Sequence, residues 1–342
     1  MHYQNEEIYK FNLDLNPKII TALKKAMLTD CRLILSLSNP DIQRLTSLSL
    51  TEVSALKDSL AEKYILKPFN VLDILNNKAD SSLQHWKLSS FCKVIDISLR
   101  GGFLSGLITE ISGESACGKT QLCLQLCISV QLNNEHPGGA VYICTEDAFP
   151  SKRLQQLIQC HSSKLPSCNL GDNIFIEHVA DFETLEFCVN KKLPTLLKRG
   201  LVQLIVIDSV AALFRCHYDH TQTVERAKHL TKFASVLRHL AFQYNIPVIC
   251  VNQVSANLSP PSGQSLVIPA LGLTWSNQIT SRIMLCKPYF TQGLEHLDTK
   301  SLKNNEPTHR KLRVIFAPHA PESEIDVYID NTGIHGISRK VV

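Results

Sequence analysis

Residues 113–120 read G-x-x-x-x-G-K-T, and these residue types at this spacing suit a loop that wraps around phosphate groups. The glycines at 113 and 118 let the backbone curl so that successive N–H groups converge on an anion, which a Cβ at either bend would obstruct. Lys119 carries a positive charge to the β- and γ-phosphates, and the Thr120 hydroxyl can complete the coordination of a magnesium ion. The residues expected around the phosphates are Gly113, Glu114, Ser115, Ala116, Cys117, Gly118, Lys119, Thr120 and Gln121.

The neighbourhood of this loop favours the same interpretation. An apolar strand is expected at 107–111 before the loop, and a helix is expected at about 120–131 after it. A strand–loop–helix order places an anion at the N-terminus of a helix, where backbone N–H groups point at it. The alternative is a chance match, which this order disfavours. The sequence therefore predicts that the chain binds a nucleotide.

Carboxylates end two of the other apolar segments. Asp208 follows the run 204–207, where a carboxylate suits a contact on the metal side of the phosphates; its alternative role is to cap the next helix. The segment 144–147 ends a second strand with Glu146 and Asp147, at the edge where ligands bind in open parallel sheets. One of the two could polarise an attacking water, or both could serve the N-terminus of the following helix. The residues alone support these two roles equally.

Other polar and aromatic residues carry weaker signals. The segment 251–253 ends a strand with two amides, of which Gln253 could sense a γ-phosphate; ordinary turn chemistry is the simpler interpretation. The thirteen histidines show no H-x-E or paired-histidine spacing, so no metal site is assigned to them. Trp86 and Trp275 are expected to anchor the core rather than to stack on bases.

Composition narrows the class of protein. With 342 residues and 44% apolar content, the chain can bury one large core, with a small satellite domain. It has no run of eighteen uncharged apolar residues and no basic region followed by an apolar stretch at its start, so neither a membrane span nor a secretory signal is expected. The twelve cysteines lie largely in apolar segments without a C-x-x-C pair, which favours buried reduced thiols. The net charge of +4 permits nucleic-acid contact without arguing for it.

Strand and helix patterns alternate from residue 101 onward. Strands are expected at 108–111, 140–144, 174–178, 204–207 and 247–251, and helices at about 120–131, 151–160, 182–198 and 222–244. This alternation predicts a parallel sheet covered by helices on both faces. Shorter apolar runs follow at 283–286, 312–316 and 325–329, with a polar stretch at 291–310 that is expected to be a loop or hairpin tip.

The N-terminal part reads differently, because residues 8–63 carry helical signals without strand signals. Helices are expected to begin at Asn16-Pro17 and at Asn39-Pro40, and Thr51 is expected to cap a third. The expected domains are a helical bundle at 1–63, a linker at 64–98 and an α/β core at 99–342.

Six segments together resemble the RecA-like recombinases of the eukaryotic branch. They lie at 99–102, 106–110, 113–121, 206–209, 251–254 and 269–275. The resemblance covers about 99–342, and the N-terminal bundle matches the family's layout. Three further stretches, 141–150, 175–181 and 189–192, are similar to one branch of the recombinase paralogs. The resemblance implies an α/β fold with a RecA-like P-loop ATPase core, whose mainly parallel sheet is flanked by helices, and a small helix-hairpin-helix-like N-terminal domain.

The resemblance also assigns roles to residues whose chemistry alone left alternatives open. Glu146 matches the catalytic carboxylate that orients water, Asp208 matches the carboxylate on the magnesium side, and Gln253 matches the amide that links the γ-phosphate to the second DNA loop. Arg153 falls where the family stacks a guanidinium on adenine. The expected catalytic residues are Lys119, Glu146 and Gln253, and the expected magnesium ligands are Thr120 and Asp208.

Assembly is a further implication of the resemblance. Pro321 and Glu322 lie in the region of a cap that closes over the ATP of a neighbouring subunit. A segment between bundle and core docks on the next subunit's sheet in this family. Here the candidate anchor is Phe69 or the stretch 72–75.

Two regions depart from the family's pattern. The second DNA loop, between residues 254 and 274, contains no lysine or arginine, although basic side chains supply most sequence-independent DNA affinity. The first loop, after Phe214, is better supplied, and its alternative interpretation is a solvated helix face. Its cations are Arg215, Arg226, Lys228 and Lys232. The hairpin turn at 46–50 lacks the glycine expected in a DNA-binding hairpin, which makes a tight turn harder.

The resemblance as a whole implies an ATP-dependent DNA-binding accessory protein of homologous recombination and double-strand-break repair, with ATP and Mg²⁺ as cofactors and a weak DNA-dependent ATPase activity. The implied partners are another recombinase paralog in a hetero-oligomer, the main recombinase filament, and single-stranded and branched DNA. The implied location is the nucleus, with the cytoplasm as a second location. The alternatives are an interaction subunit that does not hydrolyse its nucleotide, and an autonomous strand-exchange recombinase, against which the uncharged second loop argues. An unrelated helicase would need a second core, for which the chain has no room.

Overall fold

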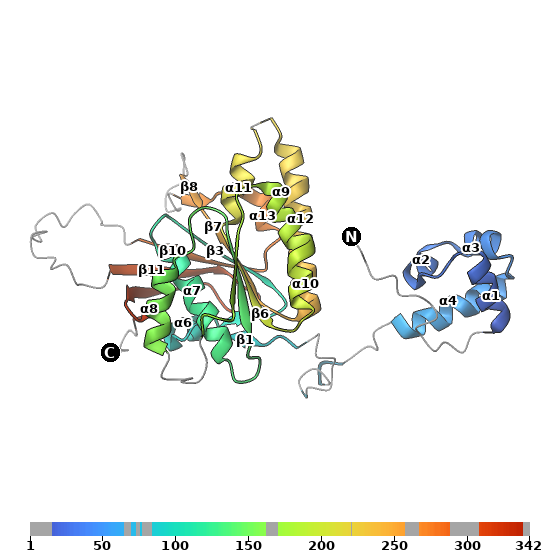
Figure 1. Cartoon of the computed structure of the whole chain (residues 1–342), viewed down its shortest axis with the longest axis horizontal. Coiled ribbons are helices and arrows are strands. Elements are labelled where there is room, and N and C mark those ends of the chain that lie inside the picture. The colour runs from blue at the N-terminus through green and yellow to red at the C-terminus, as the bar shows by residue number, and fades with distance from the viewer. Residues whose placement is uncertain are drawn as a thin grey trace, which may run out of the picture. The chain divides into compact units, whose positions relative to one another are not determined.

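The computed structural model describes residues 16–64, 70–72, 76, 84–161, 170–219, 221–256, 267–287 and 308–337. The chain divides into two compact units, 1–80 and 81–342. In the first unit the helices are α1 (Pro17–Lys25), α2 (Cys31–Ser36), α3 (Asn39–Thr46) and α4 (Leu50–Tyr64). They enclose a core of their own (Figure 1). Its fully buried members include Leu23, Ile34, Ile42, Val53, Leu56 and Leu60.

The N-terminal helices begin at polar caps. The Asn16 side chain accepts the N–H of Lys18 at 3.0 Å, and Pro17 follows it as expected. The expected cap at Thr51 is wrong, because the helix begins one residue earlier and Ser49 caps it. The Ser49 hydroxyl accepts the Glu52 N–H at 3.3 Å, and the Glu52 carboxylate accepts the Ser49 N–H at 2.8 Å. These two bonds between Ser49 and Glu52 form a capping box at the start of α4, where the turn from α3 ends.

Serine takes the place of glycine in that turn. Ser47 adopts φ 57° and ψ 22°, the left-handed conformation that glycine adopts most readily, and its N–H donates to the Gln43 carbonyl at 2.8 Å. The hairpin turn at 46–50 therefore forms without a glycine, although the missing glycine was expected to make this turn harder. The N–H of Ser49 is bonded to a carboxylate, so this donor is already used within the hairpin.

The Glu52 carboxylate also pairs with Lys18 of α1 at 2.8 Å, and this contact, with the bonds from Ser49, lowers the pKa of Glu52 to about 2. A lowered carboxyl pKa stabilises the fold above the unfolded value of 4.5, and that contribution is lost as pH falls towards 2. We expect Lys18→Ala to raise the Glu52 pKa, measured by NMR titration of its carboxyl carbon in the full chain. Lys25→Ala, which removes the same charge from the same helix, should leave that pKa unchanged; an equal rise in both variants would contradict the pairing.

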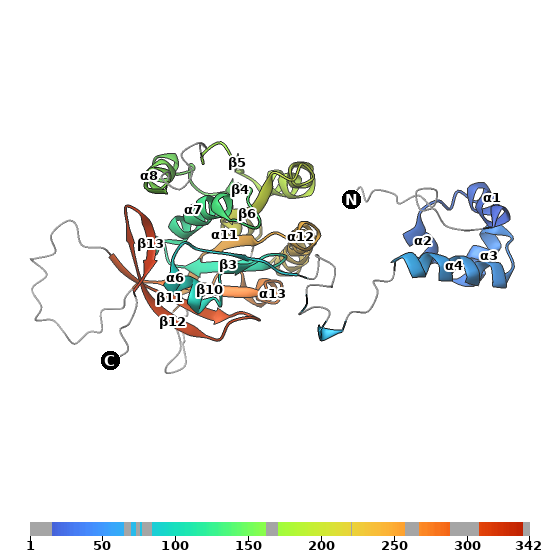
Figure 2. The same ribbon diagram turned by 90° about the horizontal axis from the view of Figure 1, so that it is seen from below.

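A nine-stranded sheet forms the centre of the second unit, within the described residues. Its strands are β3 (Ile108–Gly113), β4 (Gly139–Cys144), β5 (Ile174–His178), β6 (Val202–Asp208), β7 (Val248–Asn252), β10 (Ser281–Cys286), β11 (Thr308–Phe316), β12 (Ser323–Asp330) and β13 (Gly333–Gly336). The order is β13-β12-β11-β10-β3-β7-β6-β4-β5. The six strands from β10 to β5 are parallel, and β11, β12 and β13 extend the sheet in antiparallel fashion (Figures 1 and 2). The predicted mainly parallel sheet is confirmed.

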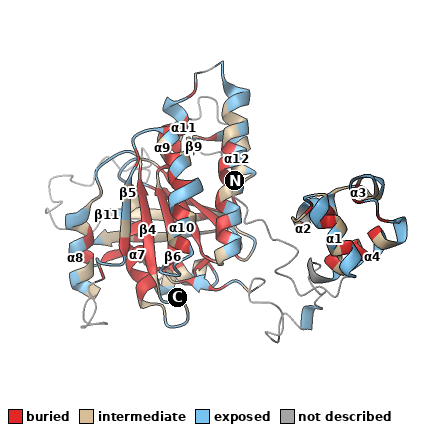
Figure 3. Cartoon of the chain, turned by 45° about the vertical axis from the view of Figure 1, so that its right-hand side comes forward, coloured by how far each residue is buried: buried red, intermediate tan, exposed pale blue. Residues whose placement is uncertain are grey.

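Helices cover both faces of this sheet, as predicted. They are α6 (Lys93–Ser98), α7 (Lys119–Ser129), α8 (Ser151–His161), α9 (Phe182–Phe187), α10 (Leu193–Leu197), α11 (Val210–Cys216), α12 (Thr223–Tyr244) and α13 (Gly272–Ser276). Because side chains alternate along a strand, Ala140 and Tyr142 of β4 belong to one hydrophobic cluster, with residues of α6, α7 and α8, whereas Val141 and Ile143 belong to the other, with residues of α9 to α13. Of the strands between the two layers, β3, β4, β7 and β10 are buried throughout, as Figure 3 shows for β4.

The expected linker 64–98 differs from the structure in its second half. There β1 (Lys87–Leu88) pairs with β2 (Phe103–Leu104), and α6 packs on β12 and β13. Trp86 is 8% exposed, and its indole N–H donates to the Asn245 carbonyl at 2.7 Å. Residues from 84 onward therefore belong to the core, and the division at 80 lies well before the expected boundary at 99.

Most of the other expected elements lie within a few residues of their predicted ends. The expected helix at 182–198 is continuous but contains a π-helical turn at 188–192, and the short helix α2 was not anticipated. Both tryptophans are buried, and so are the described cysteines other than Cys160 and Cys216. No helix in the described parts of the chain has the length and apolar character needed to span a bilayer. Of the polar stretch 291–310, residues 291–307 lie outside the described residues, whereas 308–310 belong to β11 and not to a loop. Phe69 and 73–75 also lie outside the described residues.

Candidate nucleotide-binding site

The segment 113–118 connects β3 to α7 and has the backbone of a phosphate-binding loop. Gly113 and Gly118 adopt φ 151° and 108°, in the region that favours glycine. A Cβ on Gly113 would lie 2.2 Å from the Leu285 carbonyl oxygen, and one on Gly118 would lie 2.5 Å from Cδ1 of Ile329. Gly113 is thus required by close approach to backbone as well as by its conformation, whereas Gly118, whose neighbour is the tip of a flexible side chain, is favoured by its conformation. The loop ends at Lys119, where the first turn of α7 presents its N–H groups.

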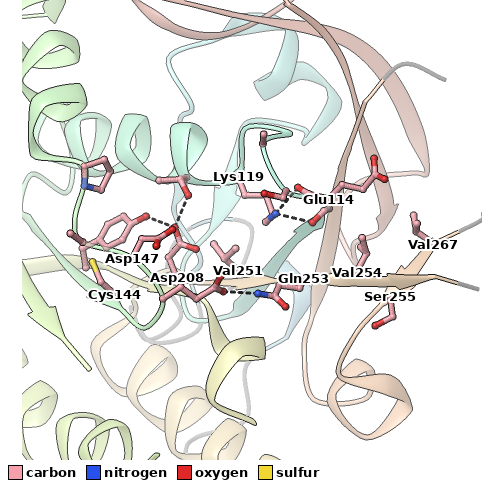
Figure 4. A pocket seen from close by; sticks show the side chains of 18 of the residues that line it. Glu114, Lys119, Cys144, Asp147, Asp208, Val251, Gln253, Val254, Ser255 and Val267 are labelled. Atoms are coloured by element: carbon pink, nitrogen blue, oxygen red, sulfur yellow. Dashed lines mark hydrogen bonds between the residues drawn. The ribbon is translucent and has the colours of Figure 1, made fainter. Parts of the chain in front are cut away.

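A cavity of about 830 Å³ opens beside this loop, at the carboxyl ends of β3, β4, β6 and β7 (Figure 4). Of the expected site residues its wall includes Gly113, Glu114, Ser115, Ala116, Lys119, Thr120, Glu146, Asp208 and Gln253, whereas Cys117, Gly118, Gln121 and Arg153 lie outside it. The Lys119 ammonium donates to the carbonyls of Gly113 and Glu114, both at 2.8 Å. Sequence positions spread over 140 residues therefore meet at one edge of the sheet, as the strand order requires.

Asp208, at the end of β6, lies beside the start of α7. Its Oδ2 accepts the Thr120 hydroxyl at 2.8 Å and the Tyr142 phenol at 2.6 Å (Figure 4). Burial raises the pKa of Asp208, while the bonds from Tyr142 and Thr120 lower it. A half-buried carboxylate next to a hydroxyl, both facing the cavity, suits a magnesium ion, which prefers oxygen ligands and takes few from the protein when phosphates supply the rest. The residues present fit the expected ion.

Tyr142 was not anticipated, because a tyrosine in an apolar strand reads as a core residue. The Tyr142→Phe substitution removes a hydrogen bond that stabilises ionised Asp208, so the pKa of Asp208 should rise further. We expect Mg²⁺ affinity in the presence of ATP to fall about tenfold or more. As the pH is lowered, Mg²⁺-dependent ATP binding should be lost at a higher pH than in the wild type, because Asp208 becomes protonated earlier.

The measurement is a Mg²⁺ titration of nucleotide binding at several pH values. Tyr244→Phe, at the end of α12, is the control and should change neither quantity. Equal Mg²⁺ affinity in wild type and Tyr142→Phe at every pH would show that the phenol does not tune the carboxylate.

Glu146 follows β4 and faces two donors. Its Oε1 accepts the side-chain amide of Gln253 at 2.9 Å and the hydroxyl of Ser209. Gln253 in turn accepts the guanidinium of Arg215 at 2.9 Å through its own carbonyl oxygen. Asp147, the other carboxylate of this segment, lines the cavity, and no bond to Gln253 is recorded for it. The structure thus brings Glu146 and Gln253 together, 107 residues apart in sequence.

Arg153 lies on α8, and the edges of its guanidinium are occupied. Its Nε donates to Gln121 at 2.7 Å, and its terminal nitrogens donate to the carbonyls of Asp330 at 2.6 Å and Asn331 at 3.0 Å. These in-plane bonds join α7 and α8 to the β12–β13 turn. Stacking on adenine uses the face of a guanidinium rather than its edge, so the expected role of Arg153 stays a prediction.

Two further features surround the loop. Arg310 of β11 donates to the carbonyl of Ala116 at 3.2 Å and supports this residue in its left-handed conformation, φ 59°. On the opposite side the cavity wall is completed by β8 (Val254–Ala256) and by Val267 at the start of β9 (Val267–Pro269). The two ends of the segment expected to be the second DNA loop therefore form part of the same cavity; residues 257–266 lie outside the described residues.

Comparison with known proteins identifies the family of this chain. A family model described as Rad51 matches residues 83–337, and one described as an XRCC3/RpoA-like helix-hairpin-helix domain matches residues 12–63. The chain belongs to the Rad51 family. The DNA repair protein XRCC3 of Bos taurus is 43% identical over 345 residues, covering 95% of this chain and 97% of the relative. XRCC3 of Mus musculus is 40% identical over 347 residues, with the same coverage. The DNA repair protein RAD51 homolog 2 of Homo sapiens is 29% identical, covering 94% of this chain and 86% of the relative.

Membership of the Rad51 family confirms the resemblance to the recombinase paralogs and the fold class, including the N-terminal helix-hairpin-helix domain. The family consists of ATP-binding proteins, generally dependent on Mg²⁺, and the relatives named above are DNA repair proteins. Residues 64–82 are matched by neither family model.

Proposed function

We propose that this chain is an ATP- and Mg²⁺-dependent accessory subunit of homologous recombination and double-strand-break repair, acting in the nucleus. It binds single-stranded and branched DNA and works in a hetero-oligomer with another recombinase paralog to support the main recombinase filament. The observation that carries the proposal is the convergence of the phosphate loop, Asp208, Glu146 and Gln253 on one cavity in a chain of the Rad51 family.

Each residue has a distinct task in this proposal. The N–H groups of the loop and Lys119 hold the β- and γ-phosphates, and Thr120 and Asp208 hold the magnesium ion. That ion, when bound, neutralises charge on the phosphate oxygens. Glu146 orients the attacking water by accepting its hydrogen bond, and Gln253 donates its amide to the γ-phosphate. Arg153 supports the adenine side.

Two features favour an accessory role over autonomous strand exchange. The described ends of the second DNA loop supply valine, serine, alanine and isoleucine but no cation, so phosphate contacts there depend on backbone N–H groups and small polar side chains. In the N-terminal hairpin, the Ser49 N–H is bonded to Glu52 and so is not available to phosphate. DNA contact then falls mainly to the first loop and to the partner, which supports a hetero-oligomer.

The test compares the purified chain alone with the chain in complex with the paralog that co-purifies with it. We expect the complex to accelerate strand pairing by the main recombinase in the presence of ATP and Mg²⁺, and to lose that effect with ADP. The chain alone should bind a non-hydrolysable ATP analogue and turn ATP over slowly. Efficient strand exchange by the isolated chain would sink the accessory role, and acceleration that is equal with ADP would remove the ATP dependence.

A further inference from the structure

A line of hydrogen bonds runs from the surface of α11 into the nucleotide cavity. Arg215, in the last turn of α11, donates to the side-chain carbonyl of Gln253 at 2.9 Å, and the amide of Gln253 donates to Glu146 at 2.9 Å (Figure 4 shows the second bond). The hydroxyl of Ser209 donates to the same Glu146 oxygen. Three segments far apart in sequence, the ends of β4 and β7 and the helix α11, are joined in this way.

The chemistry of its neighbours determines how the Gln253 amide is turned. A guanidinium is only a donor and an ionised carboxylate is only an acceptor, so the carbonyl of Gln253 must face Arg215 and its NH₂ must face Glu146. The NH₂ group therefore bonds to Glu146, while the Glu146 oxygen is covered by two donors. In this arrangement the Gln253 amide, which would reach a γ-phosphate, and the Glu146 carboxylate, which would orient water, are bonded to each other.

Arg215 differs from the other two members in its access to solvent. It is exposed and does not line the cavity, whereas Gln253 is half-buried and does. An anion outside the cavity can thus reach Arg215 without passing the nucleotide. A phosphate oxygen carries charge, so its bond to a guanidinium is stronger than the bond from a neutral amide carbonyl. Such an anion would compete directly with Gln253 for Arg215.

We propose that Arg215 is a positioning residue that couples a nucleic-acid backbone phosphodiester to the nucleotide site through Gln253. Without nucleic acid, Arg215 holds Gln253 on Glu146; with a phosphodiester on Arg215, Gln253 turns to the γ-phosphate and Glu146 is released to orient water. This coupling rests on the proposed function, because it needs both a bound ATP and a bound strand. It gives the cation at position 215 a task that the neighbouring surface cations do not share.

The sign of the effect separates this role from a merely structural one. If Arg215 restrains Gln253, its removal lets the amide reach the γ-phosphate in the absence of DNA, so Arg215→Ala should bind ATP more tightly. If Arg215 only supported the fold of the loop, its removal would weaken ATP binding instead. Arg215→Lys keeps the charge and a donor nitrogen but loses the planar fork of the guanidinium, and should restore part of the DNA-free restraint.

The experiment measures the Kd of a fluorescent non-hydrolysable ATP analogue, with Mg²⁺, for the full chain in the complex in which it purifies. We expect saturating oligo(dT) to tighten binding to the wild type by about fivefold or more. Arg215→Ala should already bind tightly without DNA, and oligo(dT) should change its Kd by less than about twofold. Lys228→Ala removes the same charge from the exposed surface of α12, and should weaken oligo(dT) binding while keeping the full tightening at saturation.

Three outcomes would count against the proposal in different ways. Failure of the wild type to bind the analogue would refute the proposed function itself. Binding by the wild type with undiminished tightening in Arg215→Ala, or weaker DNA-free binding in that variant, would overturn the coupling alone. Inorganic phosphate, used at the same phosphate concentration as oligo(dT), should tighten binding less, because Lys228 helps to hold a strand but not a free ion; equal tightening would show that Arg215 responds to any phosphate and not to a strand.

Discussion

Replacement of Glu110 by glutamine is expected to lower the free energy of unfolding of the larger unit by about 3–5 kcal/mol. Glu110 lies on β3, is 0% exposed, and accepts bonds from Arg282 of β10, from Asn252 at 2.5 Å and from the Trp275 indole at 3.0 Å. The Arg282 side chain is only 10% exposed and also donates to Ser276 at 3.0 Å. Without the carboxylate, a buried guanidinium loses its only ion-pair partner among the described residues.

Glu324→Gln is the matched control. Glu324 lies on β12 of the same sheet, within 2.5 Å of Lys311 and 3.4 Å of Arg313, but all three side chains are about 40% exposed. An exposed ion pair contributes little, so this variant should lose less than about 1 kcal/mol. Both tryptophans of the chain lie in the larger unit, so urea unfolding followed by tryptophan fluorescence reports on that unit. Equal losses in the two variants would contradict the buried-pair argument.

The Glu110 cluster also shows where sequence reasoning ends. The phosphate loop was predictable because its eight residues are contiguous and its two glycines adopt positive φ angles, which is a local reason for glycine. Glu110 and Arg282 stand 172 residues apart, and each alone reads as a polar residue interrupting an apolar run. Only the parallel pairing of β3 with β10, which sets Glu110 opposite Arg282, makes them a pair. Strands could be located from periodicity, but their neighbours in the sheet could not.

The site residues divide in the same way. Asp208, Glu146 and Gln253 each end a strand, so their position at one edge followed from the α/β pattern, although their roles came from the resemblance. Tyr142 and Ser209, which orient the two carboxylates, carry no such signal. A tyrosine within an apolar strand and a serine before a helix have ordinary explanations. Their contribution depends on which strand lies next to β4, and the pairing of β4 with β6 supplies it.

Lys119→Ala is expected to weaken ATP binding by about a hundredfold or more, since each charge-assisted hydrogen bond to phosphate is worth about 1.5–3 kcal/mol. The fold should tolerate this change. Lys119 is half-buried, and the bonds recorded for its ammonium go to carbonyls of the loop itself, at Gly113 and Glu114. The urea unfolding curve of Lys119→Ala should therefore overlay that of the wild type. Lys152→Ala removes the same charge from the exposed start of α8, and should leave ATP affinity within about twofold.

The same variant discriminates between the two remaining views of the nucleotide. If ATP serves assembly and regulation, Lys119→Ala should lose association with the co-purifying paralog and the acceleration of strand pairing together. If the bound nucleotide is only structural and not turned over, loss of the phosphate contact should leave both intact. Pull-down and strand-pairing assays on Lys119→Ala, Lys152→Ala and the wild type measure these outcomes side by side. The loop at 113–120 is the phosphate site that the sequence predicts. If Lys119→Ala loses ATP but keeps its association and its effect on strand pairing, the chain acts by interaction alone and not by ATP-dependent regulation.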